Sequence, residues 1–471
     1  MAIYYKEGEI KKRPGVYQRY SNAGNSNNVS AQDGICAIPV QACWGPLGKV
    51  VKNVNTAELI RNYGPGTYGA GYTIPAAVAM FNGGASTVYT YRMGTGGTAA
   101  KLTIGDGLTA TAKYVGTMAI SIAIQEKLGD ATKKQLQIYV GNALVETFTF
   151  EADGAKEGAN LIAAAADSKY VIFTGEATTV PVTAVASGAL TGGTNPTVTN
   201  SDYSAAFAAL ETYYYNTIAL DVDDDENMTL SLLLQAYLEN AHEHGKNAMA
   251  VVGEKTSVDF ATRCNHAKSF NDEIVIHLGG GYMAGTENKD GVLAICYTAG
   301  VIAATPSNRG ITHTVINGAT ELCESLTYTQ YEEAIASGML MVSMSPDGLI
   351  WYDSGVNTLV TPDENQDDGW KKIRRTKVRL EIFDRLDRIL APKVGRVSAD
   401  SDGVGDAVQA GQRLLDLMAD NEGKLAPSPV FQEDPDMPFS GDSAWFTIEA
   451  DDIDSLEKIY LHYKFRYSQQ S

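Results

Sequence analysis

Ala248-Met249-Ala250-Val251-Val252 is a short apolar run that decides how the middle of this chain folds. A helical pattern follows at 258–269, and a second apolar run, Ile274–Leu278, comes directly after it. Strands that are apolar throughout are typical of a sheet buried on both faces. Because such strands alternate here with helices, the pattern predicts β-α-β units and a mainly parallel sheet.

The same alternation extends over residues 199–352. Ser201 and Asp202 are expected to cap a helix that runs to Leu210. Gly245 and Gly338 are expected to end two of the later helices. The other expected elements are a strand at 216–220, helices at 225–244, 292–304 and 328–337, and a hairpin over 339–351 around Pro346-Asp347-Gly348.

Residues 21–94 have a similar mixed character, which indicates that they form the N-terminal part of the same α/β core. Asn55-Thr56 is expected to cap a short helix that ends at Gly64-Pro65. The remaining elements expected in this stretch are strands at 35–40 and 86–93 and a helix at 74–81.

Residues 95–198 differ in composition, being rich in Thr, Ala, Val and Gly. Glycine pairs flank the stretch, in Gly96-Gly97-Thr98 and Gly192-Gly193-Thr194. These flanks predict an inserted all-β, sandwich-like module. Short alternating runs recur inside it, at 119–124, 136–140, 145–150 and 170–173.

The end of the chain predicts a C-terminal α+β domain over 353–454. Helices are expected at 370–390, before Pro392, and at 406–420, and two strands should close the chain. In the second strand, 459–467, the odd positions are all apolar or aromatic, and His462, Lys464 and Arg466 face the other way. We assign 455–471 and the polar, aperiodic residues 1–20 to two terminal arms.

Bulk properties exclude several classes of function. The 471 residues carry a formal net charge of −19, which argues against nucleic acid as a main partner, because phosphate neutralisation requires clustered Lys and Arg. No transmembrane segment or signal peptide is recognisable. Five cysteines without a C-x-x-C pair indicate buried thiols in a reducing cytoplasm.

Motif searching predicts no catalytic residue, cofactor or metal site. Gly64 to Gly69 matches G-x-G-x-x-G but follows a helix instead of a strand, which favours a plain loop. Asp221 to Asp225 resembles the start of a calcium loop, yet Glu226 and Leu232 stand where Gly and Glu are required. Acids at a helix N-terminus explain that run better, although cation binding stays an alternative.

His242-Glu243-His244 is too closely spaced for H-E-x-x-H, so a solvated helix end is the simpler interpretation. The chain contains no G-x-S-x-G motif, and residue spacing gives no support for a serine hydrolase.

Four stretches taken in order resemble the contractile tail sheath family, in the version of phages of Gram-positive bacteria and R-type bacteriocins. They span nearly the whole chain except the β insert. They are Arg13-Pro14-Gly15-Val16-Tyr17; Leu190 to Thr194 with Asp202-Tyr203 and Leu210-Glu211; Ala303 to Asn308 with Ile311-Thr312-His313 and Val315 to Ala319; and Ile459 to Tyr467.

The resemblance implies a structural protein and not an enzyme. The α/β core would be the subtilisin-like sheath domain, and the β insert would face outward. The chain would assemble in the host cytoplasm, become part of a virion, and contract to drive a tube through the target cell envelope. Implied partners are other copies of the chain, the tail tube, baseplate and tail terminator proteins, without nucleic acid or membrane insertion. The alternatives are a headless R-type bacteriocin sheath, another virion protein such as a tube or baseplate protein, and a serine hydrolase.

Two surfaces are predicted to carry the assembly. The arms should add strands to sheets of neighbouring subunits; their candidate residues are Tyr4, Tyr5, Val16, Tyr17, Ile459, Leu461, Tyr463, Phe465 and Tyr467. The dense basic run that also includes Lys377 is a candidate for contact with the tube, unless local acids such as Glu381 and Asp384 neutralise it. Its candidate residues are Lys371, Lys372, Arg374, Arg375 and Arg379.

Overall fold

The computed structural model of the chain describes residues 32–466, except 70, 106, 176–180 and 225, together with two short strands near the N-terminus. These strands, β1 (Ile3–Tyr4) and β2 (Tyr17–Gln18), pair with each other in parallel. The chain forms two compact units, one of residues 1–31 and 382–451 and the other of residues 32–381 and 452–471.

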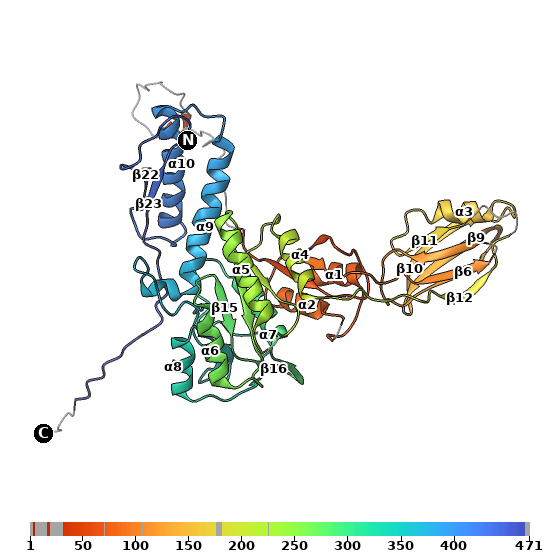
Figure 1. Cartoon of the computed structure of the whole chain (residues 1–471), viewed down its shortest axis with the longest axis horizontal. Helices are drawn as coiled ribbons and strands as arrows, with labels where there is room; N and C mark the ends of the chain where they lie inside the picture. The colour runs from red at the N-terminus through yellow and green to blue at the C-terminus, as the bar shows by residue number, and fades with distance from the viewer. Residues whose placement is uncertain are drawn as a thin grey trace. The chain divides into compact units, whose positions relative to one another are not determined.

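A seven-stranded sheet forms the centre of the larger unit (Figure 1). Its order is β19-β15-β14-β13-β3-β5-β4, and every neighbouring pair is parallel except β4 with β5. All residues of β13, β14 and β15 are buried, as expected of a sheet covered on both faces. The strands are β3 (Ile35–Val40), β4 (Val50–Asn53), β5 (Thr87–Arg92), β13 (Thr217–Ala219), β14 (Met249–Gly253), β15 (Val275–Leu278) and β19 (Met339–Leu340).

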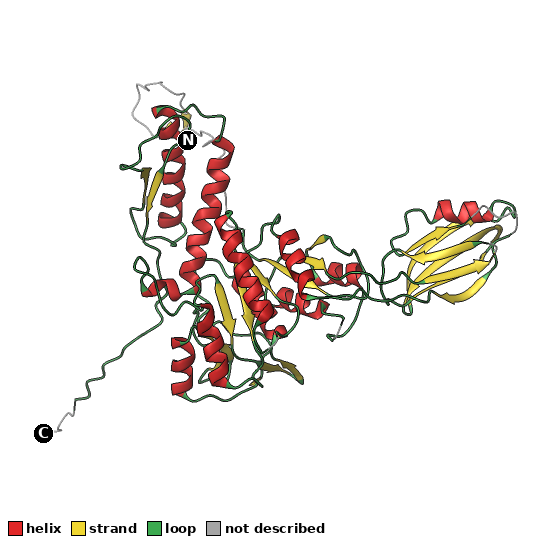
Figure 2. Cartoon of the chain, in the orientation of Figure 1, coloured by secondary structure: helices red, strands yellow, loops and turns green. Residues whose placement is uncertain are grey.

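Helices pack on this sheet in two groups, α2 against α7 and α4 against α5 (Figure 2). α7 is apolar around its whole circumference and almost entirely buried, which is typical of a central helix. The helices are α1 (Thr56–Tyr63), α2 (Ile74–Asn82), α4 (Asn200–Leu210), α5 (Thr229–Glu243), α6 (Phe260–Phe270), α7 (Val292–Ala304) and α8 (Tyr328–Ala336).

Two further small sheets complete the core. The predicted hairpin forms between β20 (Val342–Met344) and β21 (Ile350–Tyr352), but Met339 and Leu340 join the main sheet as β19 instead. The second sheet contains β16 (Tyr282–Ala284), β17 (Glu287–Lys289) and β18 (Glu321–Leu322).

Several helix starts differ from the sequence prediction, among them those of α4, α5 and α9. Thr199, not Ser201, is the N-cap of α4, and Asp202 completes a capping box from the third helical position. α5 begins at Thr229 and not at 225, and the Asp224 carboxylate accepts the N–H groups of Leu230 and Ser231 there. A 3₁₀ turn, η1 (Asp368–Lys371), precedes α9 (Ile373–Leu390), whose start was predicted at Trp370.

The insert consists of two sheets around one hydrophobic core, of order β10-β9-β8-β12 and β11-β7-β6. It is not all-β, because helix α3 (Glu157–Ala164) packs on β10 and β11. Trp44 of the core joins this cluster and stacks on Tyr170. The strands are β6 (Lys101–Gly105), β7 (Leu108–Ala112), β8 (Ile120–Lys127), β9 (Asp130–Val140), β10 (Ala143–Glu151), β11 (Val171–Thr174) and β12 (Val185–Ala189).

The smaller unit contains the end of α9, the 3₁₀ turn η2 (Ala391–Lys393), α10 (Ser401–Asp420) and a two-stranded sheet. α10 starts at Ser401, five residues before the predicted position, because Asp400 caps it. The antiparallel strands β22 (Val430–Glu433) and β23 (Phe446–Glu449) pack against α10 through Phe431, which lies over Gly411.

The five cysteines are free thiols. Cys36, Cys264 and Cys296 are buried as predicted, whereas Cys43 and Cys323 are half-buried. Burial raises the pKa of Cys36 to about 12, so this thiol stays protonated and unreactive at neutral pH.

Candidate assembly interface

The basic run lies at the start of α9. Arg375 and Arg379 lie four residues apart on α9 and share one helix face. Helical spacing from Lys371 would place it on the same face, but Lys371 lies in η1, and the extended backbone of Lys372 separates it from α9. Arg374 and Lys377 are instead buried.

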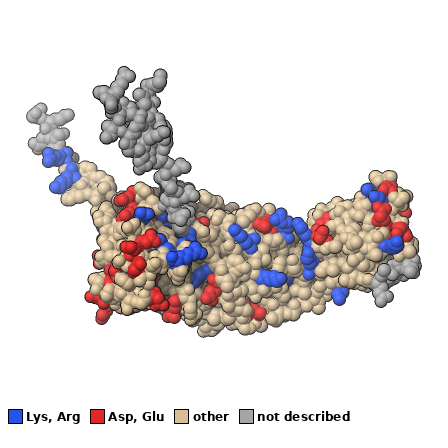
Figure 3. All heavy atoms as spheres, turned by 90° about the horizontal axis from the view of Figure 1, so that it is seen from above, with Lys and Arg blue, Asp and Glu red and all other residues tan. Residues whose placement is uncertain are grey.

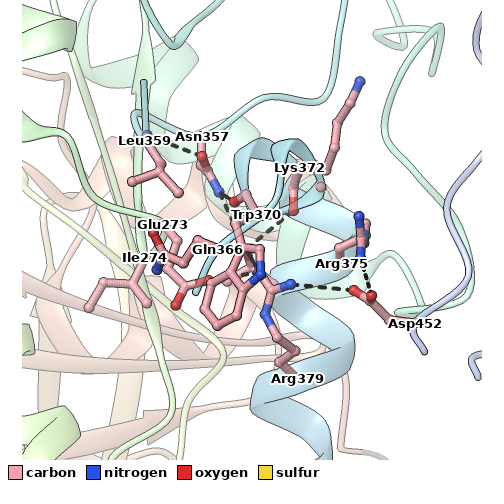
Figure 4. A network of polar contacts seen from close by, with 12 residues as sticks. Glu273, Ile274, Asn357, Leu359, Gln366, Trp370, Lys372, Arg375, Arg379 and Asp452 are labelled. Carbon is pink, nitrogen blue, oxygen red and sulfur yellow. Dashed lines mark hydrogen bonds and ion pairs between the residues drawn. The ribbon is translucent and has the colours of Figure 1, made fainter. Parts of the chain in front are cut away.

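Acids from distant parts of the chain neutralise this face (Figure 4). Arg375 forms ion pairs with Asp452 and, at 3.3 Å, with Asp367. Arg379 lies 2.7 Å from Glu273 and 3.4 Å from Asp452, and its guanidinium stacks 3.9 Å from the centre of the Trp370 ring. The hydrogen bond from Arg375 to Asp452 raises the pKa of this arginine further, so its charge is permanent.

Three more contacts extend the network toward the C-terminus. Lys372 pairs with Glu457, whose other carboxylate oxygen accepts a 2.7 Å hydrogen bond from Thr312. Arg374 donates to the hydroxyl of Ser455 at 3.1 Å. Burial lowers the pKa of Arg374, while Asp454, Asp452 and Glu457 oppose the shift.

Lys377 and Lys371 have other roles. The Lys377 ammonium donates to the carbonyl oxygens of Ile302 and Thr305 and so satisfies the C-terminal end of α7. Lys371 is partly exposed and pairs at 2.9 Å with Asp368, which is almost wholly exposed. Figure 3 shows acidic and basic side chains in groups among many other residues, and acids and bases are neighbours in some of these groups.

The acids in these contacts differ from the two named from the sequence, Glu381 and Asp384. Glu381 accepts a hydrogen bond from Ser307. The acids that pair with the basic run are Glu273, Asp367, Asp368, Asp452 and Glu457.

The last described residues form neither a helix nor a strand, so the strand predicted at 459–467 is wrong for a single copy of the chain. A β-strand requires a hydrogen-bonded neighbour, and residues 459–466 have none among the described strands. The apolar side chains of this segment are therefore exposed: Ile459 by 71%, Leu461 by 69%, Tyr463 by 69% and Phe465 by 93%.

The N-terminal candidates are described only in part. Tyr4 lies in β1 and Tyr17 in β2, whereas Tyr5, Val16 and Tyr467 lie outside the described residues.

The sheet of β22 and β23 has two open edges within the described part of the chain. Phe431 and Ile448 oppose each other, and Phe431 stacks on Phe446 at 5.3 Å, so one face of the sheet is apolar. Val430 opposes Glu449 on the other face. A further strand with one apolar and one basic face would match both sides of this sheet.

Asp221 and Asp223, in the run that resembles the start of a calcium loop, accept hydrogen bonds from other parts of the chain. Asp221 is fully buried and accepts from Thr73 at 2.6 Å and from Tyr203 at 2.7 Å. Asp223 accepts from the backbone N–H of Val292 and pairs with Lys255. Across the described residues, no group of three or more His, Cys, Asp or Glu side chains is arranged to hold a metal ion.

A cluster of three titratable residues was missed by sequence reasoning. Glu254 lies between two histidines, 2.9 Å from His266 Nδ1 and 3.3 Å from His277 Nε2. Burial lowers the pKa of His277; burial also raises the pKa of Glu254, but the interactions of Glu254 with both histidines leave it lower than usual. No sequence signal could have found this cluster, because α6 and β15 bring the two histidines together.

The sequence of this chain is similar to that of known proteins. Residues 197–353 match the family model of the phage tail sheath protein central domain. The phage-like element PBSX protein XkdK of Bacillus subtilis (strain 168) is 24% identical over 87% of this chain and 85% of its own length.

Solved structures share the fold. The sheath tail protein of Desulfitobacterium hafniense superposes with a TM-score of 0.69 at 23% identity, covering 93% of this chain and all of the other. The contracted helical sheath of the anti-feeding prophage matches with a TM-score of 0.56 at 12% identity, covering 97% and 99% of the two chains.

The family match over residues 197–353, together with the shared fold, indicates a structural protein of the contractile sheath class. The resemblance to the phage tail sheath family inferred from the sequence is confirmed for this central domain. No helix among the described residues is long and apolar enough to cross a membrane.

Proposed function

We propose that this sheath subunit polymerises with copies of itself around a tail tube and contracts to drive the tube through a cell envelope. The observation that carries the proposal is the C-terminal segment, which has exposed apolar side chains at its odd positions, His462, Lys464 and Arg466 between them, and no paired strand among the described residues. An exposed segment of this kind is an aggregation hazard in a monomer but a connector in a polymer. The contracted anti-feeding prophage sheath, whose fold is shared, supports the shortening step.

The joint between subunits is β-augmentation. Residues 459–467 of one copy would add to an open edge of the β22–β23 sheet of another copy. Ile459, Leu461, Tyr463 and Phe465 would continue the apolar face that Phe431 and Ile448 begin. His462, Lys464 and Arg466 would then lie on the face of Glu449, where opposite charges favour one register. The N-terminal arm, 1–20, would connect subunits in the same way.

Removal of residues 459–471 tests this joint. We expect soluble, folded subunits that form no tubes, because the connecting strand is lost. Negative-stain images and pelleting of the truncated and full-length chains give the measurement. A matched control replaces Lys464 and Arg466 by Gln, which keeps the apolar face and should weaken assembly without abolishing it. Normal tubes from the truncated chain would contradict the proposal.

The finer features of the particle belong to the same proposal. The core would be the subtilisin-like sheath domain, the insert would face outward, and baseplate and tail terminator proteins would bind the sheath ends. The particle would assemble in a host cytoplasm, as a virion tail or a headless bacteriocin, and the chain would have no enzymatic activity. A serine hydrolase is less well supported, because the described hydrogen bonds of His266 lead to Glu254 and Ser269 Oγ donates only to the His266 carbonyl.

Contact between the α9 basic run and the tube stays part of the proposal. Lys371 carries the cation best placed for such contact, because it is partly exposed and its partner Asp368 is exposed. Lys371→Glu should reduce co-assembly with preformed tubes at low salt, since each exposed pair is worth about 0–1 kcal/mol but recurs in every subunit. Lys52→Glu, the same charge change at an exposed site on β4, is the control. Equal co-assembly by both variants would argue against the tube contact.

A further inference from the structure

The basic start of α9 also contacts residues 452–457, where the chain re-enters the larger unit. We propose that these contacts form a clasp that fixes the root of the C-terminal arm, so that the arm able to reach a neighbouring copy begins at Lys458. We define the clasp by Lys372, Arg374, Arg375 and Arg379 on one side and Asp452, Ser455 and Glu457 on the other. Its role in assembly rests on the proposed function, but its existence as a folded contact does not.

The side chains of the segment divide cleanly into two sets. Asp452, Ser455 and Glu457 are half-buried and each contacts the α9 start. Asp454 and Leu456 between them are exposed, Leu456 by 82%. From Lys458 onward every described residue is exposed. The change at Lys458 marks where the bound root ends and the free arm begins.

Contacts outside the segment also hold the basic side of the clasp. Glu273 and the Trp370 ring position the Arg379 guanidinium. Asp367 pairs with one terminal nitrogen of the Arg375 guanidinium, and Asp452 with the other. The two guanidinium groups therefore present donors to Asp452 with little further loss of side-chain freedom. Only 10% of the Asp452 side chain is exposed, so its ion pairs are screened less than surface pairs.

A second point of attachment stabilises the other end of the segment. Glu457 binds Lys372 with one oxygen and the Thr312 hydroxyl with the other. Ser455 lies directly over Gly310, where an added Cβ would come within 3.0 Å of its hydroxyl. The segment is thus fixed against both α9 and the 310–312 loop, which the sequence resemblance did not associate with the arms.

Limited trypsin digestion of the dilute full-length chain tests the clasp. The readout is the ratio of initial cleavage rates after Lys458, next to the clasp, and after Lys464, in the free arm. We expect Asp452→Asn combined with Glu457→Gln to raise this ratio about tenfold, because a protease must release the residues flanking its cleavage site. Asp454→Asn is the matched control, since its side chain is exposed in the same segment.

Exchanging the charges of Lys372 and Glu457 distinguishes loss of the clasp from loss of folding. Lys372→Glu alone should raise the ratio, and Lys372→Glu with Glu457→Lys should return it toward the wild-type value. A ratio that none of these variants changes, or that Asp454→Asn raises equally, would overturn the clasp. Because the digestion uses unassembled subunits, its failure would leave the arm exchange between subunits untouched.

Discussion

Asp221 shows how little a sequence pattern says about the role of one residue. The acidic run that contains it was interpreted as acids at a helix N-terminus, with cation binding as the alternative, but the structure uses Asp221 as a buried acceptor for Thr73 and Tyr203. Burial raises the pKa of Asp221 to about 6, against the hydrogen bonds that lower it. The carboxyl group therefore binds a proton more tightly in the folded than in the unfolded chain.

This raised pKa makes stability depend on pH. The stabilisation from the protonated form is complete below about pH 4 and is lost as the pH rises through about 6. Asp221→Asn should remove this pH dependence. In the wild type the free energy of unfolding should fall by on the order of 3 kcal/mol between the two pH limits, at about 1.36 kcal/mol per pKa unit. Urea unfolding of the wild type and the variant at pH 4 and pH 7 measures it.

Asp221→Ala separates hydrogen bonding from charge. It leaves the hydroxyls of Thr73 and Tyr203 without their acceptor, which should cost about 1–3 kcal/mol at both pH values. If Asp221→Asn retained the full pH slope of the wild type, another group would be responsible for it.

For the basic face of α9, the positions of the arginines could be predicted from the sequence, but their acidic partners could not. Helical periodicity places Arg375 and Arg379 on one face, and the structure confirms this. Their partners could not be predicted, because Asp452 is 77 residues from Arg375 and Glu273 is 106 residues from Arg379 along the chain. Charge spacing identifies a helix face, but only tertiary folding decides which acids reach it.

At the scale of elements, local patterns found four strands of the insert, β8 to β11, but missed β6, β7, β12 and its helix α3. The Ala- and Gly-rich residues of α3 carry little periodicity, and the helix is fixed by tertiary contacts. Glu157 in its first turn is buried and binds Lys134 of β9 at 2.7 Å and the backbone N–H of Val182. Contacts between distant segments thus override a weak local preference.

The insert should be dispensable for folding and assembly of the core. Backbone bridges between Thr95 and Thr197 and between Thr98 and Thr194 bring its two connections together, so excision of about 95–198 leaves ends that a short linker can join. Excision also exposes Trp44, which packs on Tyr114 and Tyr170, so Trp44→Ser should accompany it.

Thermal unfolding and sheath assembly with the tube measure the outcome. We expect a cooperative transition and normal assembly. Insert-free chains that fold but do not polymerise would show that the module belongs to the subunit interface, and chains that do not fold would assign it to the core.

The C-terminal segment shows a different limit of prediction from sequence. Alternation over 459–467 predicts a side-chain pattern suited to a sheet, but the pattern does not supply a neighbouring strand. In one copy of the chain, 459–466 remains unpaired. A sequence can therefore encode a strand that only an assembly completes.

At the scale of the whole molecule, β-α-β alternation correctly predicted a mainly parallel sheet. It could not predict the strand order, in which β3 lies between β13 and β5, because β3 and β13 are separated by the entire insert. The ordered short motifs identified the sheath family, and the match over 197–353 confirms this.

Electron microscopy of the chain assembled with a tail tube and baseplate tests whether it forms a contractile sheath. Images taken before and after triggering, for example by mild denaturant, give the length and diameter of the cylinder around the tube. We expect a striated cylinder of this chain that becomes shorter and wider and exposes the tube. A particle in which this chain forms the inner tube, or forms no cylinder around it, would contradict the sheath function.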